Sequence, residues 1–185
     1  VDALGELARY NIVRRRELDG DFDIIGLTGS VGKTTTKDLL SSLLATVGPT
    51  VAPVGSFNNE IGLPVSVLRL KPDCEAAVLE MGMNHFGELS VLTRIAQPDL
   101  AVITNIGTMH IENLGSREGI LRAKLEILEG LRPGGRVIFN GDDALLRPLA
   151  ARYHAVCFGL SEGCDVRASR VCESACLLYT SDAAD

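Results

Sequence analysis

The chain has 185 residues, of which 46% are hydrophobic and 23% are charged, and its formal net charge is -6. This length and balance are typical of one well-packed domain and argue against disorder. The negative charge offers no basic face for nucleic acid, so we interpret the run Arg14-Arg15-Arg16 as a solvated helix face. No apolar stretch approaches the roughly 20 residues of a membrane span, and no signal peptide is visible.

Five cysteines occur at spacings that match no zinc pattern, and a domain with a real core does not need disulfides. They are Cys74, Cys157, Cys164, Cys172 and Cys176. We therefore expect reduced thiols in a cytoplasmic protein, and we expect that protein to be a monomer.

In chain order, residues 2–17 carry apolar side chains at near-helical spacing and predict a helix, which Asp19-Gly20-Asp21 ends. Apolar runs typical of buried strands then alternate with helix-period segments. The predicted strands are 24–27, 50–54, 76–79, 100–104, 136–139 and 155–158, and the predicted helices are 33–47, 60–69, 88–97, 117–130 and 143–152. This alternation predicts a doubly wound α/β fold, with a mostly parallel sheet covered by helices on both faces.

Polar clusters follow four of these strands, at 28–36, 80–85, 105–110 and 140–143. Ligands of doubly wound sheets bind beyond the carboxyl ends of the strands. We therefore expect the four loops to converge on one edge of the sheet.

The first cluster, TGSVGKTTTK, lies between a strand and a helix and predicts a phosphate-binding loop. Glycines let the backbone N–H groups curl toward phosphate oxygens, and the helix N-terminus adds partial positive charge. Lys33 would reach the β- and γ-phosphates, and the Thr34 hydroxyl could ligate Mg²⁺. The loop is a variant, because Leu27 stands where the common pattern has its first glycine. The predicted nucleotide-binding residues of the loop are Thr28, Gly29, Ser30, Val31, Gly32, Lys33, Thr34 and Thr35.

The other clusters add candidates of unequal strength. Glu80, directly after a buried apolar run, is the natural Mg²⁺ partner for a triphosphate. His110 is suited to bind a metal ion or a phosphate. From chemistry alone, Lys124 is interpreted as a solvated residue on a helix, and His85 is given no firm role.

The amide side chains leave alternatives open. Asn58 or Asn59 could donate to phosphate or carboxylate oxygens, or one of them could cap the next helix. Asn140 could pair with a base edge, but a cap on the following helix explains Asp143 equally well.

Taken together, these segments resemble the central ATP-binding domain of the Mur ligase family, which builds the peptide stem of bacterial cell-wall precursors. The strings that carry the resemblance are TGSVGKTTTK, FNNEIGLP, EMGMNHFGEL, TNIGTMHIENLGS, AKLEI and NGDD. EMGMNHFGEL favours the branch of the family that adds D-alanyl-D-alanine. The resemblance implies that Glu80 ligates one Mg²⁺, that His110 serves a second, and that Lys124 carries a CO₂-derived carbamate supporting it. It further implies that Asn59 lies near the γ-phosphate and acyl group, and that Asn140 lies near the adenine.

The reaction implied by this resemblance is amide ligation. ATP would phosphorylate the carboxylate of a UDP-N-acetylmuramoyl-tripeptide, and the amine of D-alanyl-D-alanine would attack the acyl phosphate. Residues 1–20 would be the end of a linker helix from an N-terminal domain, and 21–171 a truncated central domain. The last ten residues resemble a translated sequencing adaptor, so we expect 172–185 to be a non-native tail. We expect the isolated chain to bind nucleotide weakly and not to ligate.

Three other functions remain open from the sequence. The nearest is a sibling ligase, such as a folylpolyglutamate or cyanophycin-type enzyme. The second is a nucleotide-dependent switch, transporter or partner-binding ATPase that uses the same loop without ligation. The third is an inactive scaffold, against which the intact set of Lys33, Glu80 and His110 argues.

Overall fold

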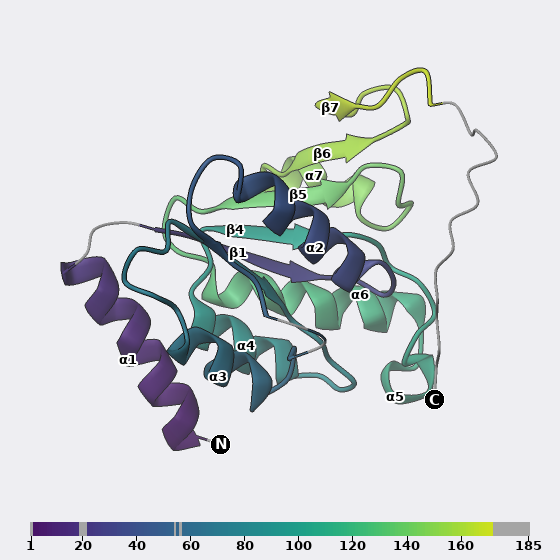
Figure 1. Ribbon diagram of the computed structural model, residues 1–185. Helices are drawn as coiled ribbons and strands as arrows, with labels where there is room; N and C mark the ends of the chain where they lie inside the picture. The colour runs from purple at the N-terminus through teal and green to yellow at the C-terminus, as the bar shows by residue number, and fades with distance from the viewer. Residues whose placement is uncertain (1, 19–21, 54, 56, 172–185) are drawn as a thin grey trace, which may run out of the picture.

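Short apolar runs form the strands of one parallel sheet (Figure 1). The computed structural model describes residues 2–18, 22–53, 55 and 57–171. Within these ranges seven strands lie in the order β2-β3-β1-β4-β5-β6-β7, and each adjacent pair is parallel. The strands are β1 (Asp23–Thr28), β2 (Thr50–Val51), β3 (Ala76–Glu80), β4 (Leu100–Ile103), β5 (Arg136–Asn140), β6 (Val156–Gly159) and β7 (Val166–Arg167).

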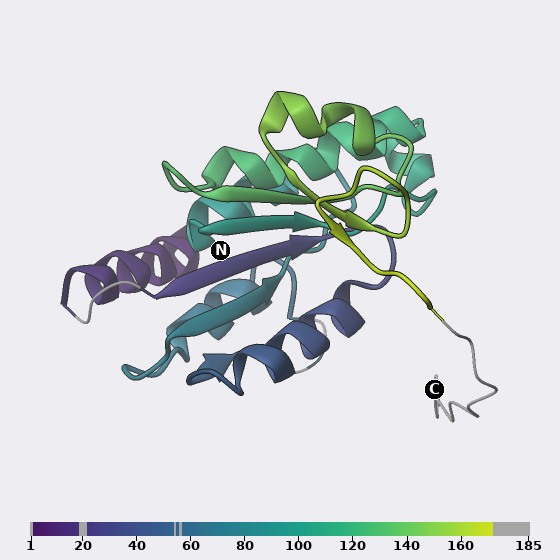
Figure 2. The ribbon, with the colours of Figure 1, turned by 90° about the horizontal axis from the view of Figure 1, so that it is seen from above.

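Helices connect the strands and cover both faces of the sheet. They are α1 (Asp2–Leu18), α2 (Lys33–Leu44), α3 (Gly62–Leu68), α4 (Glu88–Ala96), α5 (Ile111–Leu114), α6 (Arg117–Leu125) and α7 (Ala150–Tyr153). Two 3₁₀ segments, η1 (Glu126–Gly130) and η2 (Arg147–Leu149), adjoin α6 and α7. Figure 2 shows α2 on one side of the sheet and α6 on the other.

Alternate strand residues point to opposite faces and build two hydrophobic clusters. The larger cluster contains Ile24 and Leu79 and packs against α1, α3, α4 and α6. The smaller cluster contains Ile25 and Val78 and packs against Leu40 of α2. Burial on both faces explains why the strands read as continuous apolar runs, and it confirms the predicted doubly wound α/β fold.

Strand β1 lies at the centre of the sheet, between β3 and β4. The chain first builds the side that holds β2 and β3, and then crosses to β4 on the other side. Connections that diverge in this way leave a crevice beyond the carboxyl ends of the strands. The loops that follow β1, β3 and β4 therefore gather around it.

Helix α1 packs against α3 and α4 and matches the predicted helix over residues 2–17. The interpretation of its arginines as a solvated face is wrong for two of the three. Arg15 is only 7% exposed, and the Arg16 side chain is 9% exposed and pairs with Asp99 at 2.7 Å. Both guanidinium groups stack over Phe22, which desolvates them, so only Arg14 faces solvent.

The predicted helix over residues 143–152 is wrong. A turn and the short elements η2 and α7 occupy that segment. Asp143 accepts hydrogen bonds from the backbone N–H groups of Leu145 and Leu146, so its side chain stabilises a local turn instead of a long helix.

Other predicted elements are present with shifted ends. The predicted helix 117–130 is α-helical only as far as Leu125 and continues as the 3₁₀ segment η1 from Glu126. In η1 the Ile127 carbonyl accepts a hydrogen bond from the Thr93 hydroxyl at 2.6 Å. Helix α2 ends at Leu44, and β2 has only two residues. The sequence did not predict α5 or β7, which are too short to give a periodic signal.

No helix in the described part of the chain is both long and apolar enough to cross a bilayer. Among the described residues, Cys74, Cys157 and Cys164 are free thiols. The remaining two cysteines, the break at 19–21 and the predicted non-native tail lie outside the described residues.

Candidate active site

The loop between β1 and α2 has the geometry of a phosphate-binding loop. Gly32 adopts a left-handed conformation, with φ of 76°, directly before the first residue of α2. Gly29 lies so close to β4 that a Cβ atom there would fall 1.8 Å from Thr104 Oγ1. Each glycine is therefore required, the first by backbone conformation and the second by close approach.

The chain after β4 holds this loop in place. Asn105 Oδ1 accepts hydrogen bonds from the backbone N–H groups of Ser30 at 3.1 Å and Val31 at 3.0 Å. Thr104 Oγ1 and Asn105 Nδ2 both donate to the Val31 carbonyl at 3.0 Å. The sequence interpretation missed Asn105. The signal for it was an Asn directly after the predicted strand 100–104.

Glu80 ends β3 beside the first turn of α2. Its carboxylate is 3% exposed and accepts hydrogen bonds from Thr34 Oγ1 and Asn58 Nδ2, both at 2.9 Å. The structure places no ion pair on this carboxylate within the described ranges. Two hard oxygen donors, one of them a buried anion whose hydrogen-bond partners are both neutral, fit the preferences of Mg²⁺.

Lys33 is the first residue of α2, and its ammonium folds back over the loop. It donates to the Gly29 carbonyl at 2.9 Å and to the Ser30 carbonyl at 3.3 Å. Burial lowers the pKa of Lys33, and the nearby Glu80 carboxylate partly offsets this effect.

Lys124 lies on α6 and is 3% exposed, so the interpretation of it as a solvated side chain is wrong. Burial, and secondly the charge of Lys33, lowers the pKa of Lys124 from 10.5 to about 7. Among the described residues none forms a hydrogen bond or ion pair with its amine. A buried amine of this kind is half neutral near pH 7, and as a cation it lacks a counter-charge.

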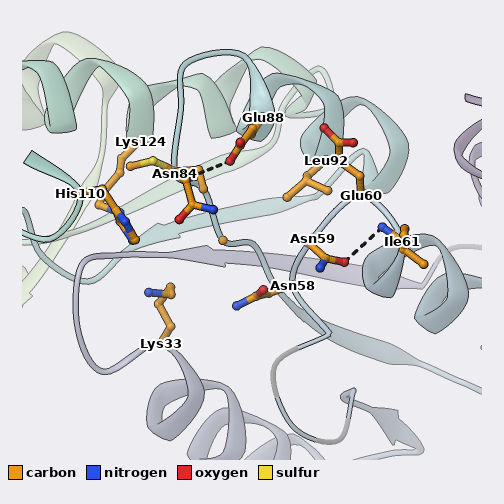
Figure 3. Close-up of a pocket in the computed structure, with 12 residues that line it drawn as sticks. Lys33, Asn58, Asn59, Glu60, Ile61, Asn84, Glu88, Leu92, His110 and Lys124 are labelled. Atoms are coloured by element: carbon orange, nitrogen blue, oxygen red, sulfur yellow. Dashed lines mark hydrogen bonds between the residues drawn. The ribbon is translucent and has the colours of Figure 1, made fainter. Parts of the chain in front are cut away.

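Lys33 and Lys124 meet in one pocket of about 420 Å³ (Figure 3), whereas Glu80 and Thr34 are not among its lining residues. Lys33, His110 and Lys124 line one side of it, and Asn59 lines the opposite side. The other lining residues are Asn58, Glu60, Ile61, Gly82, Met83, Asn84, Glu88 and Leu92. The Lys33 ammonium brings positive charge to this side of the pocket, which suits anionic ligands.

The loop that carries His110 is fixed from two sides. His110 has a left-handed backbone, with φ of 64°, directly before α5. Upstream of it, the Ile106 N–H donates to Asp143 Oδ2 at 2.7 Å, and the Ile106 carbonyl accepts from Arg117 at 2.7 Å.

The two asparagines before α3 have different roles. Asn59 Oδ1 accepts from the N–H groups of Ile61 at 3.2 Å and Gly62 at 2.8 Å, so its side chain stabilises the turn that leads into α3, whose N-cap is Ile61. The Asn59 amide still lines the pocket, whereas the Asn58 amide binds Glu80.

Several predicted residues do not line this pocket. Thr28 is fully buried at the end of β1, and Thr35 is exposed on α2. Asn140 lies at the end of β5 and accepts from the Asp142 N–H at 2.9 Å. The exposed His85 contacts Glu88 at 3.2 Å.

Comparison with known proteins identifies the family. The sequence profile of the Mur ligase middle domain matches residues 27–176. The chain belongs to the Mur ligase family. This confirms the resemblance drawn from the motifs.

Individual Mur ligases show how close the relationship is. The UDP-N-acetylmuramoyl-tripeptide–D-alanyl-D-alanine ligase of Bacillus subtilis is 54% identical over 124 residues, which are 67% of this chain and 27% of that protein. A crystal structure of MurF from Acinetobacter baumannii superposes with a TM-score of 0.80 at 40% identity, covering 91% of this chain and 36% of that one. MurF from Thermotoga maritima, determined in complex with ADP, gives a TM-score of 0.79 at 36% identity, covering 86% and 36%. The chain thus spans about a third or less of these relatives.

Proposed function

We propose that the full protein containing this domain is an ATP-dependent ligase that adds D-alanyl-D-alanine to a UDP-N-acetylmuramoyl-tripeptide in peptidoglycan precursor synthesis. The observation that carries the proposal is one pocket lined by Lys33, His110 and Lys124, next to the contact between Thr34 and Glu80. The similarity to D-alanyl-D-alanine ligases of the family supports the choice of substrates.

ATP binds with its triphosphate on the loop that runs from Gly29 to Thr35. The backbone N–H groups after Gly29 and the N-terminus of α2 bind phosphate oxygens, and Lys33 turns from the loop carbonyls to the β- and γ-phosphates. Asn140, at the end of the more distant strand β5, lies near the adenine. The complex of the T. maritima relative with ADP supports this use of the fold.

Thr34 and Glu80 would hold one Mg²⁺, and His110 together with a carbamate on Lys124 would serve a second. The metal ions would neutralise charge on the transferring phosphoryl group. The buried Glu80 carboxylate fits the first site, because the residues around it supply only neutral hydrogen bonds.

The carbamate on Lys124 explains an otherwise unfavourable arrangement. A lysine that is 3% exposed and lies near Lys33 places like charges in a low-dielectric site. Addition of CO₂ to the neutral amine forms an N–C bond, and release of one proton to solvent leaves a carbamate anion, which replaces repulsion from Lys33 with attraction. It also supplies the oxygen ligands that Mg²⁺ prefers.

The reaction then has two steps. A carboxylate oxygen of the tripeptide attacks the γ-phosphorus, ADP leaves, and Lys33 and the Asn59 amide stabilise the charge on the transferring group. The amine of D-alanyl-D-alanine attacks the acyl carbon, and inorganic phosphate leaves as the amine loses a proton. The tripeptide and the dipeptide bind mainly to parts of the protein outside residues 21–171.

We also propose that residues 1–20 link this domain to an N-terminal domain and that 172–185 are not native. The 185-residue chain alone would bind nucleotide weakly and would not form amide bonds. The full protein would be a cytoplasmic monomer.

The decisive experiment measures phosphate release by the full-length protein with ATP and Mg²⁺. We expect release only when UDP-N-acetylmuramoyl-tripeptide and D-alanyl-D-alanine are both present. Release that needs neither substrate would instead identify a plain ATPase.

A substitution separates the same two functions by chemistry. In a ligase that uses a carbamate, Lys124→Ala abolishes phosphate release, and short-chain carboxylic acids restore part of it. An ATPase without the carbamate would tolerate the substitution.

A further inference from the structure

Lys37 is a fully buried charged residue to which the reaction above gives no role. It lies one turn after Lys33 on α2, and it is 1% exposed. Its ammonium donates to the Pro53 carbonyl at 2.6 Å and to the Gly55 carbonyl at 3.2 Å, and it pairs with Asp38 at 3.2 Å. These three acceptors satisfy all three N–H groups of the ammonium.

The two backbone carbonyls belong to the segment that leads from β2 to Asn58 and Asn59. Further along the chain, Asn58 is fixed near the pocket, where the Gly82 N–H donates to the Asn58 carbonyl at 2.8 Å and Asn58 Nδ2 binds Glu80. Lys37 therefore joins the helix of the phosphate-binding loop to the segment that carries the pocket asparagines.

Two observations argue against a role in packing alone. A buried ammonium loses its hydration, so an apolar side chain would fill the same space at lower energetic cost. In addition, the ammonium binds backbone carbonyls, and this constrains the path of the segment whatever its side chains are.

We propose that Lys37 is a positioning residue that fixes the Asn58–Asn59 segment relative to the phosphate-binding loop and so aims the Asn59 amide at the reacting groups. The inference rests on the proposed ligase function. Lys37 does not line the pocket. The Lys37 ammonium is already occupied by Pro53, Gly55 and Asp38, so loss of Lys37 should change the chemical step more than nucleotide binding.

The test uses Lys37→Met in the full-length protein, with the exposed Lys71→Met as a matched control. We expect Lys37→Met to lower kcat for phosphate release by roughly 10- to 100-fold, the scale of a small misplacement of a catalytic group. The KM for ATP should stay within about threefold, and Lys71→Met should behave like the unsubstituted protein. Lys37→Arg, which keeps the donors, should recover part of kcat.

A double-mutant cycle with Asn59→Ala asks whether Lys37 acts through Asn59. The double variant should be no slower than Asn59→Ala alone. A fall in kcat of threefold or less, or losses that multiply in the double variant, would overturn the proposal. If Lys37→Met does not fold, Lys37→Gln, whose amide can still donate, carries the same cycle.

Hydrogen exchange gives a readout that needs no ligase activity. Amides in residues 57–62 should exchange faster in Lys37→Met than in Lys71→Met, with unchanged exchange in β1 and β4. Unchanged exchange in 57–62 would contradict the structural part of the proposal. Absence of ligation by the unsubstituted protein would instead contradict the proposed function.

Discussion

Replacement of Lys124 by methionine should stabilise the domain at neutral pH. The amine is buried, and its pKa falls from 10.5 to about 7 on folding. This difference corresponds to about 4 to 5 kcal/mol of stability lost when the unfolded chain is protonated. Methionine has similar length and no charge, so Lys124→Met should raise the free energy of unfolding by about that amount at and below pH 7.

The sign of the pH dependence follows from proton binding. Above pH 7 the folded state has released the Lys124 proton, whereas the unfolded state keeps it until about pH 10.5. The unfolded state then binds more protons, so the free energy of unfolding of the unsubstituted chain should rise by about 1.4 kcal/mol per pH unit through this window. Lys124→Met should lack this contribution.

Urea unfolding at pH 7, 8 and 9, in buffers free of CO₂ and metal, measures both effects. The quantity to compare is the difference between the unsubstituted chain and Lys124→Met, with the exposed Lys71→Met as the control. A difference that does not change with pH, or a variant that is less stable at pH 7, would refute the reasoning. Bicarbonate should stabilise only chains that retain Lys124, because it supplies CO₂ for the carbamate.

Three further substitutions test the site and its support. Glu80→Gln removes the buried charge next to Thr34 and should weaken Mg²⁺-dependent ADP binding at least tenfold, roughly the effect of losing one charged ligand. Titration of a fluorescent nucleotide with and without Mg²⁺ measures this affinity. An unchanged Mg²⁺ dependence would count against the metal site. Gly29→Ala places a Cβ 1.8 Å from Thr104 Oγ1 and should lower the free energy of unfolding, measured with urea, by about 1 to 3 kcal/mol. An unchanged free energy of unfolding would mean that the loop does not lie against Thr104. Asp99→Ala removes hydrogen bonds to Arg16 at 2.7 Å, Arg132 at 2.8 Å and the Ile24 N–H at 2.8 Å, and should lower the free energy of unfolding by about 2 to 3 kcal/mol. A decrease below about 1 kcal/mol in urea unfolding would show that α1 is held in place without Asp99.

The sequence alone determined the parallel α/β sheet and the phosphate-binding loop. Strands buried on both faces must be continuously apolar, so their runs are visible without coordinates. The loop could also be predicted from the sequence, because its glycines are required locally. Gly29 approaches Thr104 too closely for a Cβ atom, and Gly32 has a left-handed backbone. The motif order was specific enough to indicate the family.

Only the tertiary structure decided which polar side chains are buried and what they face. Lys124 has an ordinary helical context in sequence, and its burial depends on α6 packing into the large hydrophobic cluster that also contains residues of β4 and β5. Asn105 and Lys37 bind partners more than fifteen residues away, and no local pattern encodes those contacts. Local spacing fixes backbone conformation, whereas the environment of a charged group is set by segments distant in the chain, and it is this environment that gives the group its chemistry.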